Sequence, residues 1–219
     1  MNNRRNQRIA FYGGTFDPVH IGHLTIAKTL IDIFALDKFV FIPAFHAPHK
    51  LDKKISAAVH RYAMLALATS DAPEIRISTV ELDAPERPFT IETQTKIKSQ
   101  TNEKSQIFFV IGADSWSEIT TWREWEKVLT ATNIIVVTRP GHEIDFAHVT
   151  DEIKNRIEDR RGAANFEIAS NDRIYITDAV NLDVSASDIR RKVGEKTDGW
   201  RTLVAPQVAD YIEKYGLYI

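Results

Sequence analysis

The chain has 219 residues, a formal net charge of −2 at pH 7 and no cysteine. Its length permits one large domain, and its near-neutral charge argues against general attraction to nucleic acid or to an anionic membrane surface. The absence of cysteine excludes disulfides, thiolate metal sites and a cysteine nucleophile. No apolar run reaches the roughly 18 residues of a membrane span, so a cytoplasmic location is expected. Residues 1–7 are polar and basic and are expected to form a flexible leader.

Short apolar runs alternate with helical patterns along most of the chain. The apolar runs predict strands over residues 8–12, 38–42, 74–79, 106–111, 133–138 and 173–176. Apolar residues at helical spacing predict helices over residues 21–34, 56–69, 91–99, 122–129, 149–161, 185–193 and 206–215, with Ser56 as one N-cap. This alternation indicates a parallel sheet with right-handed crossovers, and the continuously apolar strands fit a sheet covered on both faces.

The predicted fold is therefore α/β, a Rossmann-like doubly wound parallel sheet with a small C-terminal helical part. Residues 8–180 are expected to form the α/β core, and residues 181–219 the helical part. In such sheets, ligands bind where the carboxyl ends of the strands meet the starts of helices. The turn after the first strand is at such a point.

That turn reads GGTFDPVHIGH over residues 13–23. Its candidate phosphate-binding residues are Gly13, Gly14, Thr15, Phe16 and Asp17. Glycines allow the backbone to approach a phosphate closely, and the helix that follows offers unpaired amides and a positive dipole end. His20 and His23 lie three residues apart, so their rings should project from one face. An imidazolium donates from both ring nitrogens, so this pair suits an oligophosphate.

The loop matches neither the Walker pattern nor the G-x-G-x-x-G of dinucleotide-binding proteins. The alternative interpretation is an ordinary strand–helix turn with two surface histidines. The combination of two glycines with Thr15, Asp17, Pro18 and His-Ile-Gly-His favours the phosphate site.

The segment GGTFDPVHIGHL resembles the signature of the H-x-G-H nucleotidylyltransferase superfamily. Further segments resemble those of bacterial nicotinate-nucleotide adenylyltransferases, in the order and spacing of that family. They are FIPAFHAPHK, ERPFTIETQ, FVIGADSWSEITTWREWEKVL, VTRPG, VSASDIR and APQVADYIEKYGLY. Together the motifs span about residues 8–218, which makes the resemblance much more specific than any one motif.

The resemblance implies an enzyme of NAD biosynthesis that uses ATP and nicotinate mononucleotide. The 5′-phosphate of that mononucleotide attacks the α-phosphorus of ATP, giving deamido-NAD and pyrophosphate. Mg²⁺ is implied as the cofactor, bound through ATP phosphates and water rather than by a protein ligand. The alternatives are the same chemistry on nicotinamide mononucleotide or another phosphate acceptor, or a non-catalytic nucleotide-sensing module. The sequence leaves a homo-oligomer open.

The resemblance assigns four cations to the reacting phosphates: His20, His23, Lys50 and Arg190. His23 is expected to donate to the α-phosphate in the transition state, with His20 beside it. Lys50 offers a mobile point charge, although taken alone it is an ordinary surface lysine. Arg190 would reach the leaving pyrophosphate.

Hydroxyl and carboxylate groups complete the expected ATP site. Ser185 and Ser187 form the second half of the phosphate clamp, although Ser185 with Asp188 also makes a capping box. The family's usual Ser-Ser-Thr is Ser-Ala-Ser here, with Ala186 in the middle. After Gly112, which belongs to the same site, Asp114 either accepts hydrogen bonds from ribose hydroxyls or caps a helix.

Three residues are assigned to the acceptor side. Thr90 matches the position that faces the pyridine carboxylate, although Phe89 and Glu92 stand where tyrosine and aspartate are common. Trp122 is a candidate stacking platform for the nicotinate ring. Arg139 either contacts nucleotide or faces solvent at the end of a strand.

Overall fold

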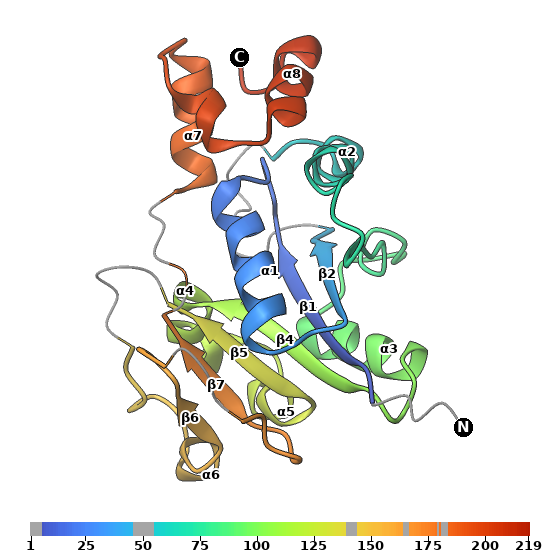
Figure 1. Cartoon of the computed structure of the whole chain (residues 1–219), viewed down its shortest axis with the longest axis vertical. Coiled ribbons are helices and arrows are strands. Elements are labelled where there is room, and N and C mark those ends of the chain that lie inside the picture. Colours follow the sequence, from blue (N-terminus) through green and yellow to red (C-terminus); the bar gives the residue numbers. More distant parts are fainter. Residues whose placement is uncertain (1–5, 46–54, 139–143, 164–166, 179, 181–183) are drawn as a thin grey trace.

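A computed structural model describes residues 6–45, 55–138, 144–163, 167–178, 180 and 184–219 (Figure 1). Its centre is a seven-stranded sheet in the order β3-β2-β1-β4-β5-β7-β6, and every strand pair is parallel. The strands are β1 (Arg8–Gly14), β2 (Lys38–Pro43), β3 (Ile75–Ile77), β4 (Gln106–Gly112), β5 (Asn133–Val137), β6 (Ile157–Asp159) and β7 (Ile174–Thr177). The predicted α/β, Rossmann-like class is confirmed.

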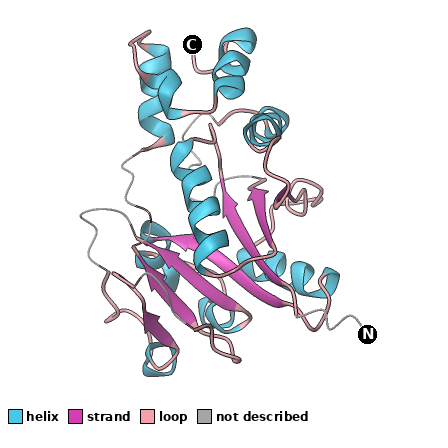
Figure 2. Ribbon diagram, viewed as in Figure 1, coloured by secondary structure: helices cyan, strands magenta, loops and turns pink. Residues whose placement is uncertain are grey.

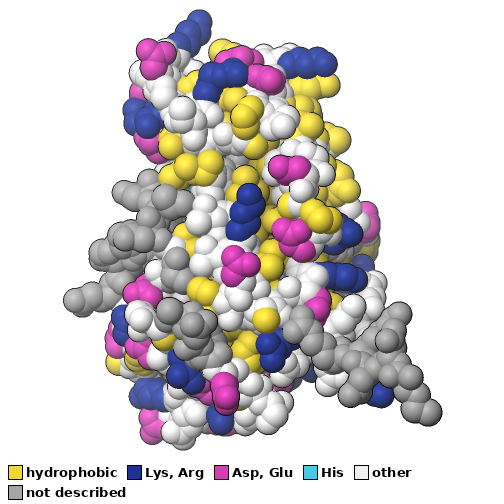
Figure 3. Space-filling model, viewed as in Figure 1, with side chains coloured by type: hydrophobic (Ala, Val, Ile, Leu, Met, Phe, Trp, Pro, Cys, Tyr) yellow, Lys and Arg dark blue, Asp and Glu magenta, His cyan; other side chains and the backbone are white. Residues whose placement is uncertain are grey.

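Helices cover both faces of this sheet (Figure 2). They are α1 (Ile21–Ile33), α2 (Ala58–Ala68), α3 (Thr90–Gln100), α4 (Ala113–Ser117), α5 (Trp125–Thr130), α6 (Asp151–Lys154), α7 (Ala186–Gly194) and α8 (Pro206–Tyr215), with 3₁₀ turns η1 (Ile119–Thr121) and η2 (Trp200–Leu203). No helix in the described part of the chain has the length and apolar character needed to cross a membrane. The surface drawn in Figure 3 carries acidic and basic side chains interspersed.

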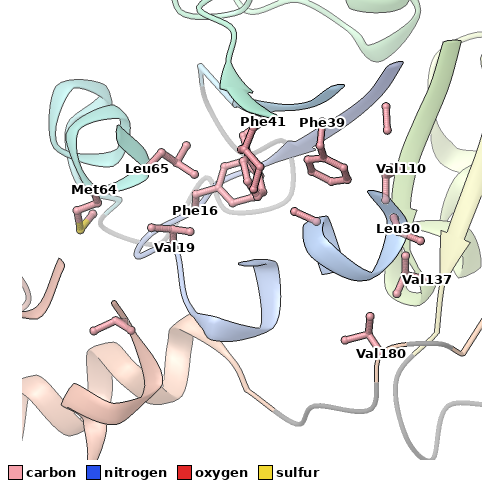
Figure 4. Close-up of a cluster of buried hydrophobic side chains, with 14 of the residues drawn as sticks. Phe16, Val19, Leu30, Phe39, Phe41, Met64, Leu65, Val110, Val137 and Val180 are labelled. Atoms are coloured by element: carbon pink, nitrogen blue, oxygen red, sulfur yellow. The ribbon is translucent and has the colours of Figure 1, made fainter. Parts of the chain in front are cut away.

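The continuously apolar strands contribute side chains to two separate hydrophobic cores, one on each face of the sheet. In β4, Phe108 and Val110 face the core that α1, α2, α7 and α8 complete, whereas Phe109 and Ile111 face the core under α3, α4, α5 and α6. Alternate residues of a strand point to opposite faces, so an unbroken apolar run serves both layers. Part of the first core is shown in Figure 4, where Phe16 lies against Phe41.

Strand order reverses beside β1. The chain adds β2 and β3 outward on one side of β1, and then returns to place β4 on the other side. A crevice at the carboxyl end of the strands is expected at such a switch point. The C-terminal helices α7 and α8 lie beyond the carboxyl end of β1, where they can close that crevice (Figure 1).

Three predicted helices differ from the structure. The expected helix over residues 149–161 is wrong: α6 ends at Lys154, and Ile157–Asp159 forms the edge strand β6 against β7. Val149, Ile153 and Ile157 have helical spacing, but Ile157 packs from a strand. The helix expected from residue 122 begins at Trp125, since Trp122 is extended and Glu124 is left-handed with φ 51°. Ser56 does not cap α2, because Ala57 occupies the N-cap position.

Candidate active site

A cavity of about 240 Å³ opens at the carboxyl end of β1. Its lining joins the phosphate loop, defined here as residues 13–20, to the start of α1, the first turn of α4 and the first turns of α7. The lining residues are Thr15, Phe16, Asp17, His20, His23, Asp114, Ser185, Ala186, Ser187 and Arg190. Nine of these ten are candidate residues of the sequence analysis, drawn from segments that are distant in the chain.

The two histidines of the phosphate site are stacked on each other. His20 occupies the N-cap of α1, and its backbone N–H donates to Nδ1 of His23 over 3.2 Å. The ring centroids lie 3.7 Å apart with 28° between the planes. Because Nδ1 of His23 accepts a hydrogen bond, the proton of the neutral ring is on Nε2. In this arrangement Nε2 is the nitrogen that His23 can offer to a ligand, whereas the imidazolium expected from the sequence would offer both.

The position of the His20 ring in this stack leaves little room for a side chain at Gly22. The sequence alone had indicated no role for this glycine. A Cβ at Gly22 would lie 3.1 Å from both Cε1 and Nδ1 of His20. A contact this short forces the His20 ring to move. The H-x-G-H pattern itself was the signal, since its glycine separates the two histidines that must stack.

We expect Gly22→Ala to lower kcat by about 10-fold, because a small displacement at a reacting group carries a large kinetic penalty. The substitution favours a helical backbone by roughly 1 kcal/mol, so stability should not fall as activity does. Steady-state kinetics and thermal unfolding of the same samples separate the two effects. Lys28→Ala, at an exposed position of the same helix, is the control. Unchanged kcat in Gly22→Ala would contradict the proposed packing requirement.

Phe16 supports the ring of His23 from the other side. It is 2% exposed, has φ 50°, and meets His23 edge-on with ring centroids 5.0 Å apart. A Cβ at Gly14 would lie 2.7 Å from Cζ of Phe16, so the glycine at the end of β1 leaves space for this ring. Gly13 has no such close neighbour: a Cβ there would meet Phe109 at 3.7 Å.

Two arginines hold the backbone of the phosphate loop. Arg61 of α2 is 2% exposed, and it donates from Nη1 to the carbonyl of Thr15 over 2.9 Å and from Nε to that of Ser56 over 3.1 Å. Burial lowers the pKa of Arg61, and the charge of Asp17 partly offsets this effect. Arg190 donates from Nη1 to the carbonyl of Asp17 over 2.6 Å. Sequence reasoning missed Arg61, whose signal was a charged residue within a helix made up mostly of apolar residues.

The carboxylate of Asp17 is engaged inside the protein. Asp17 is 2% exposed; its Oδ1 accepts from the Tyr218 hydroxyl over 2.7 Å, and its Oδ2 accepts from the Ser56 N–H over 3.1 Å. These contacts favour a positioning role for Asp17 over the direct ATP contact expected from the sequence. Ser56 thus anchors the loop instead of capping α2.

The start of α7 forms the opposite wall of the cavity. Ser185 is the N-cap, and its Oγ accepts from the N–H of Asp188 over 3.1 Å, which confirms the capping interpretation. Ser187 is exposed, and its Oγ accepts from Nη2 of Arg190 over 3.1 Å. A capped helix start beside a guanidinium provides donors and positive potential for an anion.

On the third side, Asp114 is exposed and contributes a carboxylate to the cavity. Gly112 ends β4 and occupies the N-cap of α4, so the alternative in which Asp114 caps this helix is wrong. An exposed carboxylate at the end of β4 can accept hydrogen bonds from sugar hydroxyls.

The two predicted acceptor regions meet through Arg123, outside the lining of the cavity. Thr90 is the first residue of α3, and the Arg123 guanidinium next to Trp122 lies 4.7 Å from the centroid of the Phe89 ring. Arg123 also lies 3.8 Å from Glu92. Trp122 packs against the second core, and its Nε1 is buried without a hydrogen-bond partner in the described part of the chain.

Glu81 lies beneath α3 on this side. Its Oε1 accepts from the hydroxyl of Thr93 over 2.9 Å. Burial raises the pKa of Glu81, while the hydrogen bond from Thr93 lowers it. Lys50 and Arg139 lie outside the described residues.

Known proteins resemble this chain over most of its length. The family model "Cytidylyltransferase-like" matches residues 11–192. A Thermoanaerobacter protein named "Probable nicotinate-nucleotide adenylyltransferase" is 37% identical over 217 residues, covering 98% of this chain and 95% of the relative. A protein of the same name from Corynebacterium glutamicum is 34% identical over 215 residues, covering 98% of this chain and 90% of the relative.

Solved structures share the fold. Plasmodium falciparum nicotinic acid mononucleotide adenylyltransferase, solved in complex with NaAD, matches with a TM-score of 0.73 at 20% identity and covers 97% of this chain and 98% of its own. The same enzyme complexed with APC gives a TM-score of 0.72, with the same two coverages. From the matched family model and the full-length relatives, the chain belongs to the nicotinate-nucleotide adenylyltransferase family of cytidylyltransferase-like proteins.

Proposed function

We propose that this protein transfers the adenylyl group of ATP to nicotinate mononucleotide, giving deamido-NAD and pyrophosphate in NAD biosynthesis. The observation that carries the proposal is the cavity at the switch point, where His23, Arg190 and the starts of α1 and α7 converge. Membership of the family supports the choice of reaction. A cytoplasmic location and a homo-oligomer stay predictions.

The chemistry is a direct displacement at phosphorus. An oxygen of the acceptor's 5′-phosphate forms a bond to the α-phosphorus of ATP. The bond from that phosphorus to the α–β bridging oxygen breaks, and pyrophosphate leaves. The protein forms no covalent bond to the substrates in this step. The rate enhancement therefore comes from alignment of the two anions and from stabilisation of charge on the transferring group.

Each wall of the cavity provides groups that bind the substrates in this step. His23 donates from Nε2 to an α-phosphate oxygen, since its Nδ1 is already occupied by the His20 N–H. Arg190 and the amides at the start of α7 bind the β- and γ-phosphates and the leaving pyrophosphate. The side chain of Asp114 accepts from the ribose.

Mg²⁺ is proposed to enter with ATP. Among the described residues, no group of three or more histidine, aspartate or glutamate side chains could hold a metal ion. Of the carboxylates that line the cavity, Asp114 is exposed and Asp17 is engaged by Tyr218 and Ser56. This donor set fits an ion held by phosphate oxygens and water. When bound, the ion neutralises charge on the leaving pyrophosphate.

Lys50 is proposed to contribute a further charge to the phosphates. Described residues on both sides of Lys50 in the sequence contact the phosphate loop: the N–H of Ala44 donates to the carbonyl of Gly14 over 2.8 Å, and that of Ser56 donates to Asp17. These two hydrogen bonds support the proposal, because they hold the residues that precede and follow the segment with Lys50 in the sequence against the phosphate loop. For Arg139, which follows β5, we retain a nucleotide contact as the proposal.

The start of α3 is proposed to select the acidic acceptor. The positive end of this 11-residue helix, which begins at Thr90, favours a carboxylate over a neutral amide. Arg123 adds a cation beside Trp122, and Trp122 offers an aromatic plane for the pyridine ring. Nicotinamide mononucleotide would lose the electrostatic part of this recognition.

The test is pyrophosphate release from ATP, with nicotinate mononucleotide and nicotinamide mononucleotide run side by side. We expect kcat/KM to be at least about 10-fold higher for the nicotinate form, as about 1.4 kcal/mol of charge recognition provides. Removal of Mg²⁺ with a chelator should abolish release, and added Mg²⁺ should restore it. Equal rates with both acceptors would contradict the selectivity. ATP binding without release would favour the nucleotide-sensing alternative.

A further inference from the structure

The C-terminal tail that follows α8 returns to the phosphate loop. Gly216 ends α8 with φ 59°, and the N–H of Leu217 donates to the carbonyl of Ile212 over 3.0 Å. Tyr218 then places its hydroxyl 2.7 Å from Oδ1 of Asp17, a residue 201 positions earlier in the chain. The backbone passes close to the end of α7, since a Cβ at Gly194 would lie 3.1 Å from the Tyr218 carbonyl oxygen.

Tyr218 is held in a conformation that its own backbone does not favour. Its φ is 69°, in the left-handed region that non-glycine residues rarely adopt. Such a conformation persists where the surroundings determine it, and it is found disproportionately at functional sites. The hydroxyl also lies 3.9 Å from Sδ of Met64 in α2. The tail is therefore docked between α2, α7 and the phosphate loop.

The hydrogen bond connects this tail to the groups that would bind ATP. Asp17 accepts the hydrogen bond from Tyr218 on its side chain, and its backbone carbonyl accepts a second hydrogen bond from Nη1 of Arg190. Within the same loop, Phe16 precedes Asp17 and packs edge-on against His23. Burial and the negative charge of Asp17 raise the pKa of Tyr218, so the hydroxyl remains protonated and able to donate.

We propose that Tyr218 is a positioning residue for adenylyl transfer: its hydroxyl fixes Asp17, and through Asp17 it fixes Arg190 and the phosphate loop. The inference rests on the proposed function, since its main readout is turnover. Without the hydroxyl, a buried carboxylate oxygen has lost its donor, and the loop must shift to find another partner. Such a shift moves Arg190 and His23 away from the geometry that the displacement needs.

The test compares Tyr218→Phe with Tyr215→Phe. Both variants lose a tyrosine hydroxyl near the same chain end, but Tyr215 is 52% exposed and packs on Tyr211 and His60, away from the loop. We expect Tyr218→Phe to lower kcat by about 10- to 100-fold with little change in KM for nicotinate mononucleotide. The ATP-induced rise in Tm should shrink in Tyr218→Phe, while Tyr215→Phe should match the wild type in both measurements.

A role in stability alone predicts a different pattern. In that case Tyr218→Phe would show a lower Tm, but its kcat per folded molecule and its ATP-induced rise in Tm would equal those of Tyr215→Phe. That result would overturn the inference. The inference would also be overturned if Tyr218→Phe were unfolded at the assay temperature but had wild-type kcat at a lower temperature, where it is folded. Inactivity of the wild type with nicotinate mononucleotide would instead refute the proposed function, and the ATP-induced rise in Tm would still test Tyr218.

Discussion

Replacing His23 by alanine is expected to lower kcat by about 100- to 1,000-fold, which is the range for loss of one preorganised donor to a transition state. The backbone N–H of His20 occupies Nδ1 of His23, which leaves Nε2–H as the donor to the α-phosphate. Because charge grows on the transferring phosphoryl group, the bond matters most in the transition state. The loss should therefore appear in kcat, while ATP affinity, measured by calorimetry, should change much less.

His60→Ala provides the control for the loss of an imidazole. His60 lies in α2, and its Nδ1 is 2.9 Å from the Tyr211 hydroxyl rather than in the cavity. This variant should keep kcat within about 2-fold of the wild type, in line with the small effects of substitutions away from special features. If His23→Ala and His60→Ala had similar kcat values, His23 would not be the transition-state donor. Equal losses in kcat and in ATP affinity would assign His23 to ground-state binding instead.

The central part of the fold and most of the ATP cavity could be predicted from the sequence. Strong apolar runs such as residues 106–111 have one stable placement, in the middle of a parallel sheet. The predicted groups at the phosphate site then converge because β1 and β4 end at the same edge, and α7 begins opposite them. Ser185 as the N-cap of α7 was predictable as well, because capping depends on residues three positions apart.

Contacts that depend on the assembled tertiary structure could not be predicted. The pairing of Asp17 with Tyr218 joins positions with no local pattern, and Asp17 alone was consistent with a direct ATP ligand. The edge strand β6 has three residues, so its pairing with β7 outweighed a helical spacing that spans residues 149–157. The acceptor side depends on Arg123, which comes between two tryptophans and gave no sequence signal of its contact with Phe89.

Arg61→Ala is expected to reduce the free energy of unfolding by about 3–5 kcal/mol, because two hydrogen bonds from a buried charged group, each worth about 1.5–3 kcal/mol, are lost. The guanidinium is 2% exposed and donates to carbonyls of Thr15 and Ser56, which would lose their partner. The charge of Asp17, which acts on Arg61, would lose its nearby cation. Urea unfolding measures the change. Arg61→Lys keeps the charge but loses the fork of donors, so it should fall between the wild type and Arg61→Ala.

The comparison that decides this prediction is with Arg76→Ala. Arg76 is exposed on β3 and donates to the carbonyl of its neighbour Ile75, so its loss should hardly move the urea midpoint. A similar midpoint for Arg61→Ala would mean that water reaches the Thr15 and Ser56 carbonyls and replaces the guanidinium. A large loss of stability, together with weaker ATP binding in the folded Arg61→Lys variant, would show that the same buried arginine maintains both the fold of α2 and the shape of the phosphate loop.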